Sequence, residues 1–359
     1  MSSTRLSHSS LNRYLSCPKS YELHYLKRLR PTKQSAALLF GTAIDKASEV
    51  YASTRDILSA TETFNNTWMF QKINDVETDL RTCTDIVYSN SDIDTDLLSS
   101  YHWNAMEIKK IPFEYAMAKK DSDGFDNLSQ EEKLTINRVA WECMCFKGML
   151  MITKFAEIFD ANVEEVLGSQ VPIDLTNEEG DAVTGFADFV FKWKGKDKPI
   201  VFDLKTSGIK YEDDSVLTSP QLTLYVHALR EKFDNTNTAG YLVLHKRVIK
   251  NKTKLCEKCG FNGSGKNFKT CNNELNGSRC NGEWNEVIRP EIGYQVIIDD
   301  IPEILEERVL ENFTEVNHGI KSNVFPRNFG NCIKFNGMVT CEFYNLCHHK
   351  DGKGLCEKA

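Results

Sequence analysis

Two charged residues interrupt the apolar run Ile-Val-Phe-Asp-Leu-Lys-Thr-Ser at residues 200–207. A nearly continuous apolar run of this length is typical of a β-strand that is buried on both faces. Because side chains alternate across a strand, Asp203 and Lys205 point to the same face. A buried charge is costly unless it is paired or binds a metal. The pair is therefore either a structural ion pair at a strand end or part of a reactive site.

A second carboxylate is expected beside Asp203, on the strand that precedes it. Residues 185–193 have strand character, and a turn at Gly195 and Lys196 would place Asp188 opposite Asp203. A shift of one residue would turn Asp188 to the other face. Two adjacent carboxylates raise each other's pKa, and Mg²⁺ or Mn²⁺ between them removes that cost. With Lys205 alongside, this arrangement fits metal-assisted phosphodiester hydrolysis, whereas a solvated strand end is the plainer alternative.

The chain contains twelve cysteines, and most of them are clustered. In a reducing compartment such clusters are metal ligands more often than disulfides. One cluster begins with a Cys-x-x-Cys pair and lies in loops rich in Gly and Asn, which could not form a core without a metal. Four thiolates suit tetrahedral Zn²⁺, so a structural zinc ribbon is expected. Its ligands would be Cys256, Cys259, Cys271 and Cys280.

A basic run precedes this ribbon, at residues 245–254. Its Lys246, Arg247 and Lys250 could bind nucleic-acid phosphates, although a solvated charge run would look the same. The overall net charge of −7 excludes a uniformly basic nucleic-acid coat but not a local basic groove. No apolar segment is long enough to span a membrane, and the first residues lack the pattern of a signal peptide, so an intracellular protein without membrane contact is expected.

The length of 359 residues suggests about two domains. Helical spacing is found at 9–30 and 37–51, and polar helical sequence fills 52–165. From 166 onward, strand patterns alternate with a helix that begins at Ser219 and Pro220, suitable residues for an N-cap and a first turn. This order of elements indicates an α/β domain with a mixed sheet.

Several motifs together resemble one family. In chain order they are CPKSYELHYL, FGTAIDKASEVY, GFADFVF, IVFDLKTS and QLTLYVHAL. This series resembles the RecB-like branch of the PD-(D/E)XK nuclease superfamily, to which CRISPR-associated RecB-like exonucleases, the AddB nuclease domain and phage exonucleases belong. The resemblance implies an α/β fold with a restriction-endonuclease-like mixed sheet flanked by helices, a helical insertion and an inserted zinc ribbon. The corresponding segments are 1–51 (N-terminal helices of the core), 52–165 (helical insertion), 166–249 (catalytic core), 250–286 (zinc ribbon) and 287–359 (end of the core with a cysteine-rich tail).

The resemblance also implies roles for individual residues. Asp188 and Asp203 match the metal-binding acids, and Lys205 matches the catalytic lysine. Gln221 and Tyr225 match the helix motif that faces the active site. Since they are four residues apart, they share one face of a helix. The plainer alternatives are ordinary packing for Tyr225 and a surface amide for Gln221.

Two positions depart from the pattern of the family. Asp45 stands where relatives have a His, and it could bind Mg²⁺ or Mn²⁺ through oxygen or simply be a surface residue. Gln170 stands where relatives often have a Glu, which would lower activity if that Glu assists metal binding. Glu164 or Glu165 could substitute for it. These departures keep open a catalytically weak or inactive nucleic-acid-binding protein.

The cysteines near the two chain ends suggest a further site. In iron–sulfur members of the family, one cysteine near the N-terminus joins three near the C-terminus. By resemblance, the ligands of a [4Fe–4S] cluster would be Cys17, Cys332, Cys341 and Cys347. Eight residues separate Cys332 from Cys341, a longer gap than in relatives. A zinc site and the absence of a metal are alternatives, and Cys356 is either left over or replaces Cys332.

The resemblance favours a metal-dependent DNA exonuclease that acts on single strands or DNA ends in recombination, repair or phage DNA metabolism. Its location would be the cytoplasm of a bacterial cell or of a phage-infected host. A non-specific endonuclease is a further alternative. The sequence has no Gly-rich phosphate loop followed by Lys and Ser or Thr, so any helicase or recombinase partner would be a separate chain.

Overall fold

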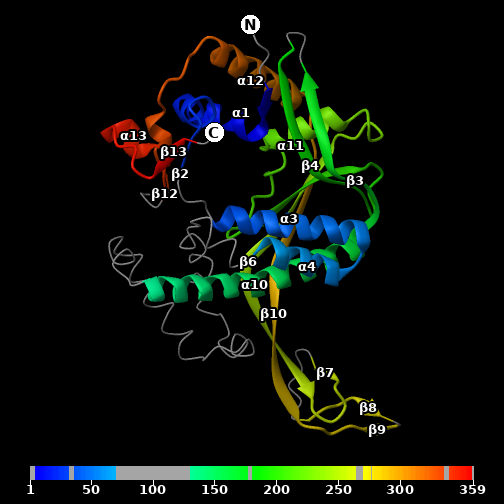
Figure 1. Ribbon diagram of the computed structural model, residues 1–359. Coiled ribbons are helices and arrows are strands. Elements are labelled where there is room, and N and C mark those ends of the chain that lie inside the picture. Colours follow the sequence, from blue (N-terminus) through cyan, green and yellow to red (C-terminus); the bar gives the residue numbers. More distant parts are fainter. Residues whose placement is uncertain are drawn as a thin grey trace.

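The computed structural model describes residues 5–31, 36–69, 130–176, 180–263, 270–275, 277–334 and 339–357. Its centre is a seven-stranded mixed sheet in the order β1-β4-β5-β6-β10, with β3 paired to β4 and β7 paired to β6. The strands are β1 (Arg5–Ser7), β3 (Val163–Thr176), β4 (Ala182–Trp193), β5 (Ile200–Ser207), β6 (Thr238–Cys256), β7 (Asn262–Gly263) and β10 (Trp284–Asp300). The predicted mixed α/β sheet flanked by helices is confirmed (Figure 1).

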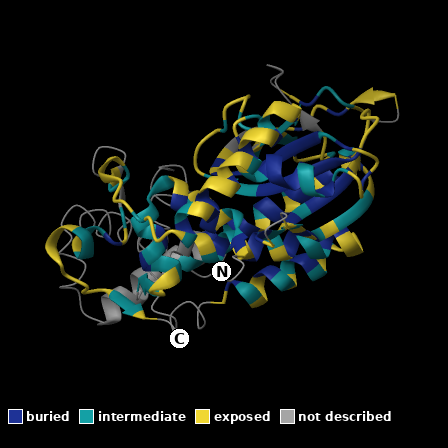
Figure 2. Ribbon diagram, turned by 90° about the horizontal axis from the view of Figure 1, so that it is seen from above, coloured by how far each residue is buried: buried dark blue, intermediate teal, exposed yellow. Residues whose placement is uncertain are grey.

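Helices cover both faces of the sheet. One face packs against α3 (Ala36–Thr54), α4 (Ile57–Thr67) and α10 (Gln130–Asn162), and the other against α1 (His8–Ser16), α11 (Pro220–Leu229) and α12 (Glu303–Lys321). Phe202 belongs to the first core and its neighbour Val201 to the second, which explains why the apolar run of β5 is continuous. In Figure 2 the central strands are buried, whereas the outward sides of the helices are exposed.

Strands β6 and β10 form a long antiparallel pair that extends beyond the helical layers (Figure 1). Their register runs from Thr238 opposite Asp300 to Cys256 opposite Trp284. β6 therefore passes through the expected segment boundary at 249 without interruption, and the cysteine-rich segment is carried at the tip of two core strands. This tip also contains β7 and the short hairpin of β8 (Glu274–Leu275) and β9 (Ser278–Arg279).

The C-terminal segment returns to the N-terminal one. Strand β13 (Leu355–Glu357) pairs with β2 (Leu29–Pro31), which follows α2 (Pro18–Tyr21) and the π-helical turn Glu22–Leu26. Between α12 and β13 lie the 3₁₀ turn Phe329–Asn331, the strands β11 (Ile333–Lys334) and β12 (Val339–Thr340), and helix α13 (Tyr344–His349). This pairing brings the two cysteine-bearing ends of the chain together.

The expected helical insertion at 52–165 is described at its two ends, where α4 and α10 lie against α3. Residues 70–129 are outside the described residues. Among the described residues, no helix combines the length and the apolar character that a membrane span requires.

Candidate active site and metal centres

The candidate active site lies at one edge of β4, where two strands meet end to end. β3 pairs with β4 along its whole length, so β1 and β5 share the opposite edge. β1 runs parallel to β4 and pairs at 182–184, and β5 runs antiparallel and pairs at 189–191. The C-terminal ends of β1 and β5 therefore face each other across residues 185–188. On this edge of β4, residues 185–188 pair with neither β1 nor β5, which leaves room for side-chain chemistry.

Asp188 and Asp203 are cross-strand neighbours in this gap. Phe189 pairs with Phe202, and Gly195 has the positive φ of 74° that the connecting turn requires. The register is the one that the sequence predicted. The Oδ2 atom of Asp188 accepts a hydrogen bond from the backbone N–H of Leu204 at 2.8 Å. This carboxylate therefore continues the hydrogen bonding of the strand pair into the gap.

Lys205 lies beside Asp203. Its Nζ is 2.5 Å from Oδ2 of Asp203, whose side chain is only 2% exposed. The two charges therefore form a close ion pair in a largely buried position. Burial lowers the pKa of Lys205, but the Asp203 carboxylate outweighs it, so the pKa is raised. Lys205 is therefore held in its charged form.

A side chain of helix α11 holds the second carboxylate oxygen of Asp203, Oδ1, by a hydrogen bond. Nε2 of Gln221 donates to Oδ1 of Asp203 at 2.9 Å and lies 3.0 Å from Oη of Tyr225. Ser219 begins the helix, with its side chain accepting from the N–H of Leu222 at 3.2 Å. The sequence motif thus brings Gln221 and Tyr225 to the acids, on the helix face that was expected.

Asp45 of α3 completes a group of three acids. Burial, reinforced by Asp203, raises the pKa of Asp45 to about 7. Burial also raises the pKa of Asp188, and both Asp203 and Asp45 act in the same direction. Burial raises the pKa of Asp203 against the opposing effect of Lys205. Carboxylates that raise the pKa of their neighbours fit a hard divalent cation, which would lower the repulsion among them.

His8 is a site residue that the sequence did not reveal. It is the first residue of α1, directly after β1, and its Nε2 is buried without a hydrogen bond among the described residues. Burial, together with the charge of Lys205, lowers the pKa of His8 to about 4. In the sequence, His8 stands among serines of a helix start, and Ser7 and Ser10 indeed form a capping box. Only the pairing of β1 with β4 brings it to the gap.

Glu49 is a second residue that the sequence did not indicate. It lies one turn after Asp45 on α3, contributes to the raised pKa of Asp45, and is hydrogen-bonded by the side chain of Gln170. Gln170 has a φ of 48°, a left-handed conformation that is unusual for this residue in a strand. Glu165 instead pairs with Lys192 at 2.7 Å. Glu49, rather than Glu165, is therefore the additional carboxylate near the acids.

The family follows from comparison with known proteins. A family model of the PD-(D/E)XK nuclease superfamily matches residues 5–348. The chain belongs to the PD-(D/E)XK nuclease superfamily. A search of curated proteins finds no match. Membership in this superfamily implies a nuclease, and hence a metal-dependent phosphodiesterase with a nucleic-acid substrate. The acids, the lysine and the helix α11 described above are the parts of this superfamily member that fit such chemistry.

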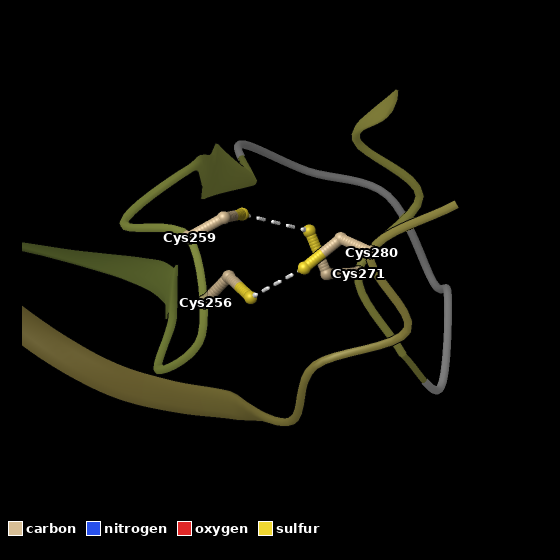
Figure 3. A group of neighbouring side chains, drawn as sticks. All are labelled: Cys256, Cys259, Cys271 and Cys280. Carbon is tan, nitrogen blue, oxygen red and sulfur yellow. Dashed lines mark hydrogen bonds between the residues drawn. The ribbon is translucent and has the colours of Figure 1, made fainter. Parts of the chain in front are cut away.

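This superfamily member also carries four cysteines at the tip of the β6–β10 pair (Figure 3). The sulfurs of Cys256, Cys259, Cys271 and Cys280 all lie within 4.8 Å of one another. All four are free thiols, and the closest sulfur pairs, shown dashed in Figure 3, are 3.6 Å apart, too far for a disulfide. Burial raises the pKa of Cys271 to about 12, with Cys256 acting in the same direction. A cation among the sulfurs would stabilise the thiolates, so the cluster fits a metal site.

The local backbone explains this geometry. The N–H of Gly260 donates to the carbonyl of Cys256, and the N–H of Cys271 donates to the carbonyl of Gly282, each at 2.9 Å. Gly260 has a φ of 67°, which the tight turn after the Cys-x-x-Cys pair requires. Each turn presents two sulfurs to the other, as the spacing in the sequence predicted.

Cysteines from the N-terminal and C-terminal segments line one pocket, called the tail pocket below. Cys17, Cys332, Cys341 and Cys347 all line it, together with aromatic residues of the tail. Cys17 is the N-cap residue of α2. The N–H of Cys341 donates to the carbonyl of Cys332 at 2.8 Å, so the eight residues between them form a loop whose ends meet. Cys356 lies in β13 opposite Arg30 and does not line the pocket.

Of the basic residues expected to contact phosphate, Arg247 is exposed and lines a cavity beside the end of β5. Lys246 is only 9% exposed and engages other groups of the protein. Lys250 belongs to β6, and its side chain lies outside the described part of the chain.

Proposed function

We propose that this chain is a Mg²⁺- or Mn²⁺-dependent DNA exonuclease of the RecB-like branch, acting on single strands or DNA ends. The observation that carries the proposal is the convergence of Asp45, Asp188 and Asp203 beside Lys205 at the gap between β1 and β5. A structural ion pair would not need two further acids whose pKa values Asp203 raises. The motif order in the sequence supports the choice of branch.

In this proposal the three acids hold the cation, which supplies activation of water and neutralisation of charge at the phosphate. Lys205 is kept charged by Asp203 and binds a non-bridging oxygen of the scissile phosphate. Gln221 orients Asp203, because its amide holds Oδ1 while Oδ2 faces Lys205. Because Asp45 is a carboxylate like Asp188 and Asp203, all the proposed ligand atoms are oxygens. Such a donor set favours Mg²⁺ or Mn²⁺ over softer cations.

The two cysteine groups would be structural in this proposal. The cluster at the tip of β6 and β10 suits Zn²⁺, since four thiolates form a closed tetrahedral site. The four cysteines around the tail pocket suit a [4Fe–4S] cluster that ties the chain ends together. A helicase or recombinase that supplies single strands would be a separate chain.

The test is cleavage of end-labelled linear and circular single-stranded DNA with Mg²⁺ or Mn²⁺, using protein purified without oxygen. Wild type is compared with Lys205→Ala and with Lys192→Ala, which removes an exposed lysine of β4 that pairs with Glu165 outside the site. We expect loss of linear DNA with wild type and Lys192→Ala, and a rate at least about 100-fold lower with Lys205→Ala.

Each other outcome changes the proposal. Cleavage of circular DNA would replace the exonuclease with an endonuclease. Cleavage of RNA in place of DNA would overturn the substrate. Binding without cleavage in either metal would leave an inactive nucleic-acid-binding protein, and equal rates for Lys205→Ala and Lys192→Ala would remove Lys205 from the mechanism.

A further inference from the structure

A cavity of about 720 Å³ lies next to the catalytic strand. Its lining includes Gly208, directly after the last residue of β5, and His245, which is in register with Ser207 on the neighbouring strand β6. Lys205 lies two residues before Ser207 on the same strand. If the scissile phosphate of a nucleic-acid strand contacts Lys205, the nucleotide next to that phosphate would therefore lie at this cavity.

An irregular pairing of β6 with β10 shapes the cavity. Ile292 pairs with Val248 and Tyr294 with Leu244, so residues 245–247 of β6 face the single residue Gly293. Such bulges redirect side chains and are common beside active sites. A Cβ atom on Gly293 would lie in contact with Cδ2 of His245 and Cδ1 of Ile249, each at 3.4 Å, so a side chain at this position would add atoms beside this wall of the cavity.

The lining of the cavity is cationic and polar. Lys210 and Arg247 are exposed and contribute two positive charges, and no carboxylate is found among the described residues that line it. His245 is about nine-tenths buried, and its Nε2 has no hydrogen-bond partner among the described residues. In a chain with a net charge of −7, this local excess of donors is suited to an anion such as a phosphate.

The cavity also offers an aromatic surface. Tyr294 lies on the lining and is 51% exposed, although a large apolar ring in a strand is usually covered. The loop opposite is held in place, because Gln295 accepts from the N–H of Tyr211 at 2.8 Å and donates to its carbonyl at 2.9 Å. An exposed aromatic ring beside cations is the combination that binds unpaired nucleotides, with the base stacked and the phosphate neutralised.

Resting on the function proposed above, we infer that this cavity is a nucleotide subsite for the strand next to the scissile bond. Arg247 and Lys210 bind the phosphate, His245 contributes a hydrogen bond, and Tyr294 stacks on the base. Because stacking needs a base that is not paired in a duplex, the subsite selects single-stranded nucleic acid.

The test measures binding of a fluorescent single-stranded oligodeoxynucleotide by anisotropy, in a Lys205→Ala background so that cleavage does not interfere. The variants are Arg247→Ala, Lys210→Ala, Tyr294→Ala and Tyr294→Phe, and the matched control is Arg308→Ala, which removes an exposed arginine of α12. Thermal unfolding of each variant establishes that it is folded.

Arg247→Ala is expected to raise Kd at least fivefold and to lower the slope of log Kd against log salt by about 0.7, the value for one phosphate contact on a single strand. Tyr294→Ala is expected to raise Kd about 5-fold to 100-fold, with Tyr294→Phe close to wild type. In oligonucleotides with one abasic residue at successive positions, one position should weaken binding to wild type but not to Tyr294→Ala.

Failure of the subsite and failure of the nuclease can be told apart. If Arg247→Ala and Tyr294→Ala bind like Arg308→Ala while wild type cuts DNA, the subsite is wrong and the nuclease stands. If wild type cuts nothing but binding depends on both residues, the subsite stands and the nuclease is wrong. Equal dependence on Tyr294 for a duplex would overturn the selection of single strands.

Discussion

The side-chain amide of Gln221 lies 2.9 Å from the carboxylate of Asp203, so helix α11 fixes the acid that strand β5 supplies. The same nitrogen lies 3.0 Å from the hydroxyl of Tyr225, one turn along the helix. Asp203 is 1% exposed, so no bulk water replaces this donor when it is removed. The orientation of the proposed metal ligand therefore depends on a residue that is not itself a ligand.

We expect Gln221→Ala to weaken metal binding about 10-fold to 100-fold, which is typical when a partner that orients a metal ligand is lost. The measurement is the cleavage rate as a function of Mn²⁺ concentration. The half-saturating concentration should rise, with part of the maximal rate recovered at high Mn²⁺. Tyr225→Phe removes only the hydroxyl that meets Gln221 and should have a smaller effect. An unchanged half-saturating concentration in Gln221→Ala would contradict this role.

The core of the site could be predicted from the sequence because its geometry is local. A connection of residues 194–199, with a turn at Gly195, joins two strands that follow each other in the chain, and their register decides that Asp188 meets Asp203. A capped helix with residues four apart then decides that Gln221 and Tyr225 share a face. The cysteine cluster is likewise governed by two short turns.

The remaining site residues depend on contacts between distant segments. His8 reaches the gap because the three residues of β1 pair with β4, and so short a strand has no pattern of its own. Glu49 is recognisable only once α3 lies beside the left-handed Gln170. The cavity beside β5 arises from the unequal pairing of β6 with β10, two strands that are not connected by a short turn.

His8 should make the metal-free protein less stable in acid. Its pKa is about 4 in the folded protein and near 6.5 when unfolded, so between these values only the unfolded chain takes up the proton. The free energy of unfolding therefore falls as the pH decreases from about 6.5 to 4, by on the order of 1–3 kcal/mol from this residue. His8→Gln removes this contribution.

The measurement is urea unfolding in EDTA across this pH range. The His8→Gln variant should lose less stability than wild type on acidification, and His318→Gln, which removes an exposed imidazole of α12, should follow wild type. Parallel pH profiles for wild type and His8→Gln would show that the folded protein does not hold His8 neutral.

Removal of one cysteine from the β6–β10 tip should release a metal without unfolding the core. We expect about one Zn²⁺ per chain at this site, and its loss in Cys271→Ser, because a structural zinc site needs all four ligands. The core should persist, since among the described residues the β6–β10 pair is what joins the cluster to it. Metal analysis and limited proteolysis check this.

Cys356→Ser is the matched control, because it removes a thiol outside both cysteine groups. In Cys271→Ser, cleavage should concentrate at residues 254–286, while the rest of the chain remains resistant. Retention of stoichiometric zinc in Cys271→Ser would exclude the cluster as the zinc site, and iron in place of zinc would change the identity of the metal.

If the cysteines of the tail pocket bind a metal cluster, the link that this cluster makes between the two chain ends should depend on Cys17. Cys17 is the only N-terminal cysteine among the described residues that line the pocket, whereas Cys332, Cys341 and Cys347 come from the C-terminal segment. If the four hold a [4Fe–4S] cluster, protein purified without oxygen should contain about four iron atoms per chain. Cys17→Ser should lose them, and Cys356→Ser should not.

Loss of the cluster should also loosen the C-terminal segment. The remaining described contacts between the ends include the pairing of β2 with β13 and the ion pair of Arg13 with Glu342, and an ion pair of this kind, partly exposed, contributes little stability. In Cys17→Ser we therefore expect faster proteolysis after α12, with the sheet intact. Zinc in wild type that disappears in Cys17→Ser would replace the iron–sulfur cluster with a zinc site. Equal proteolysis of Cys17→Ser and Cys356→Ser, with no metal in either, would show that the pocket is closed by packing alone.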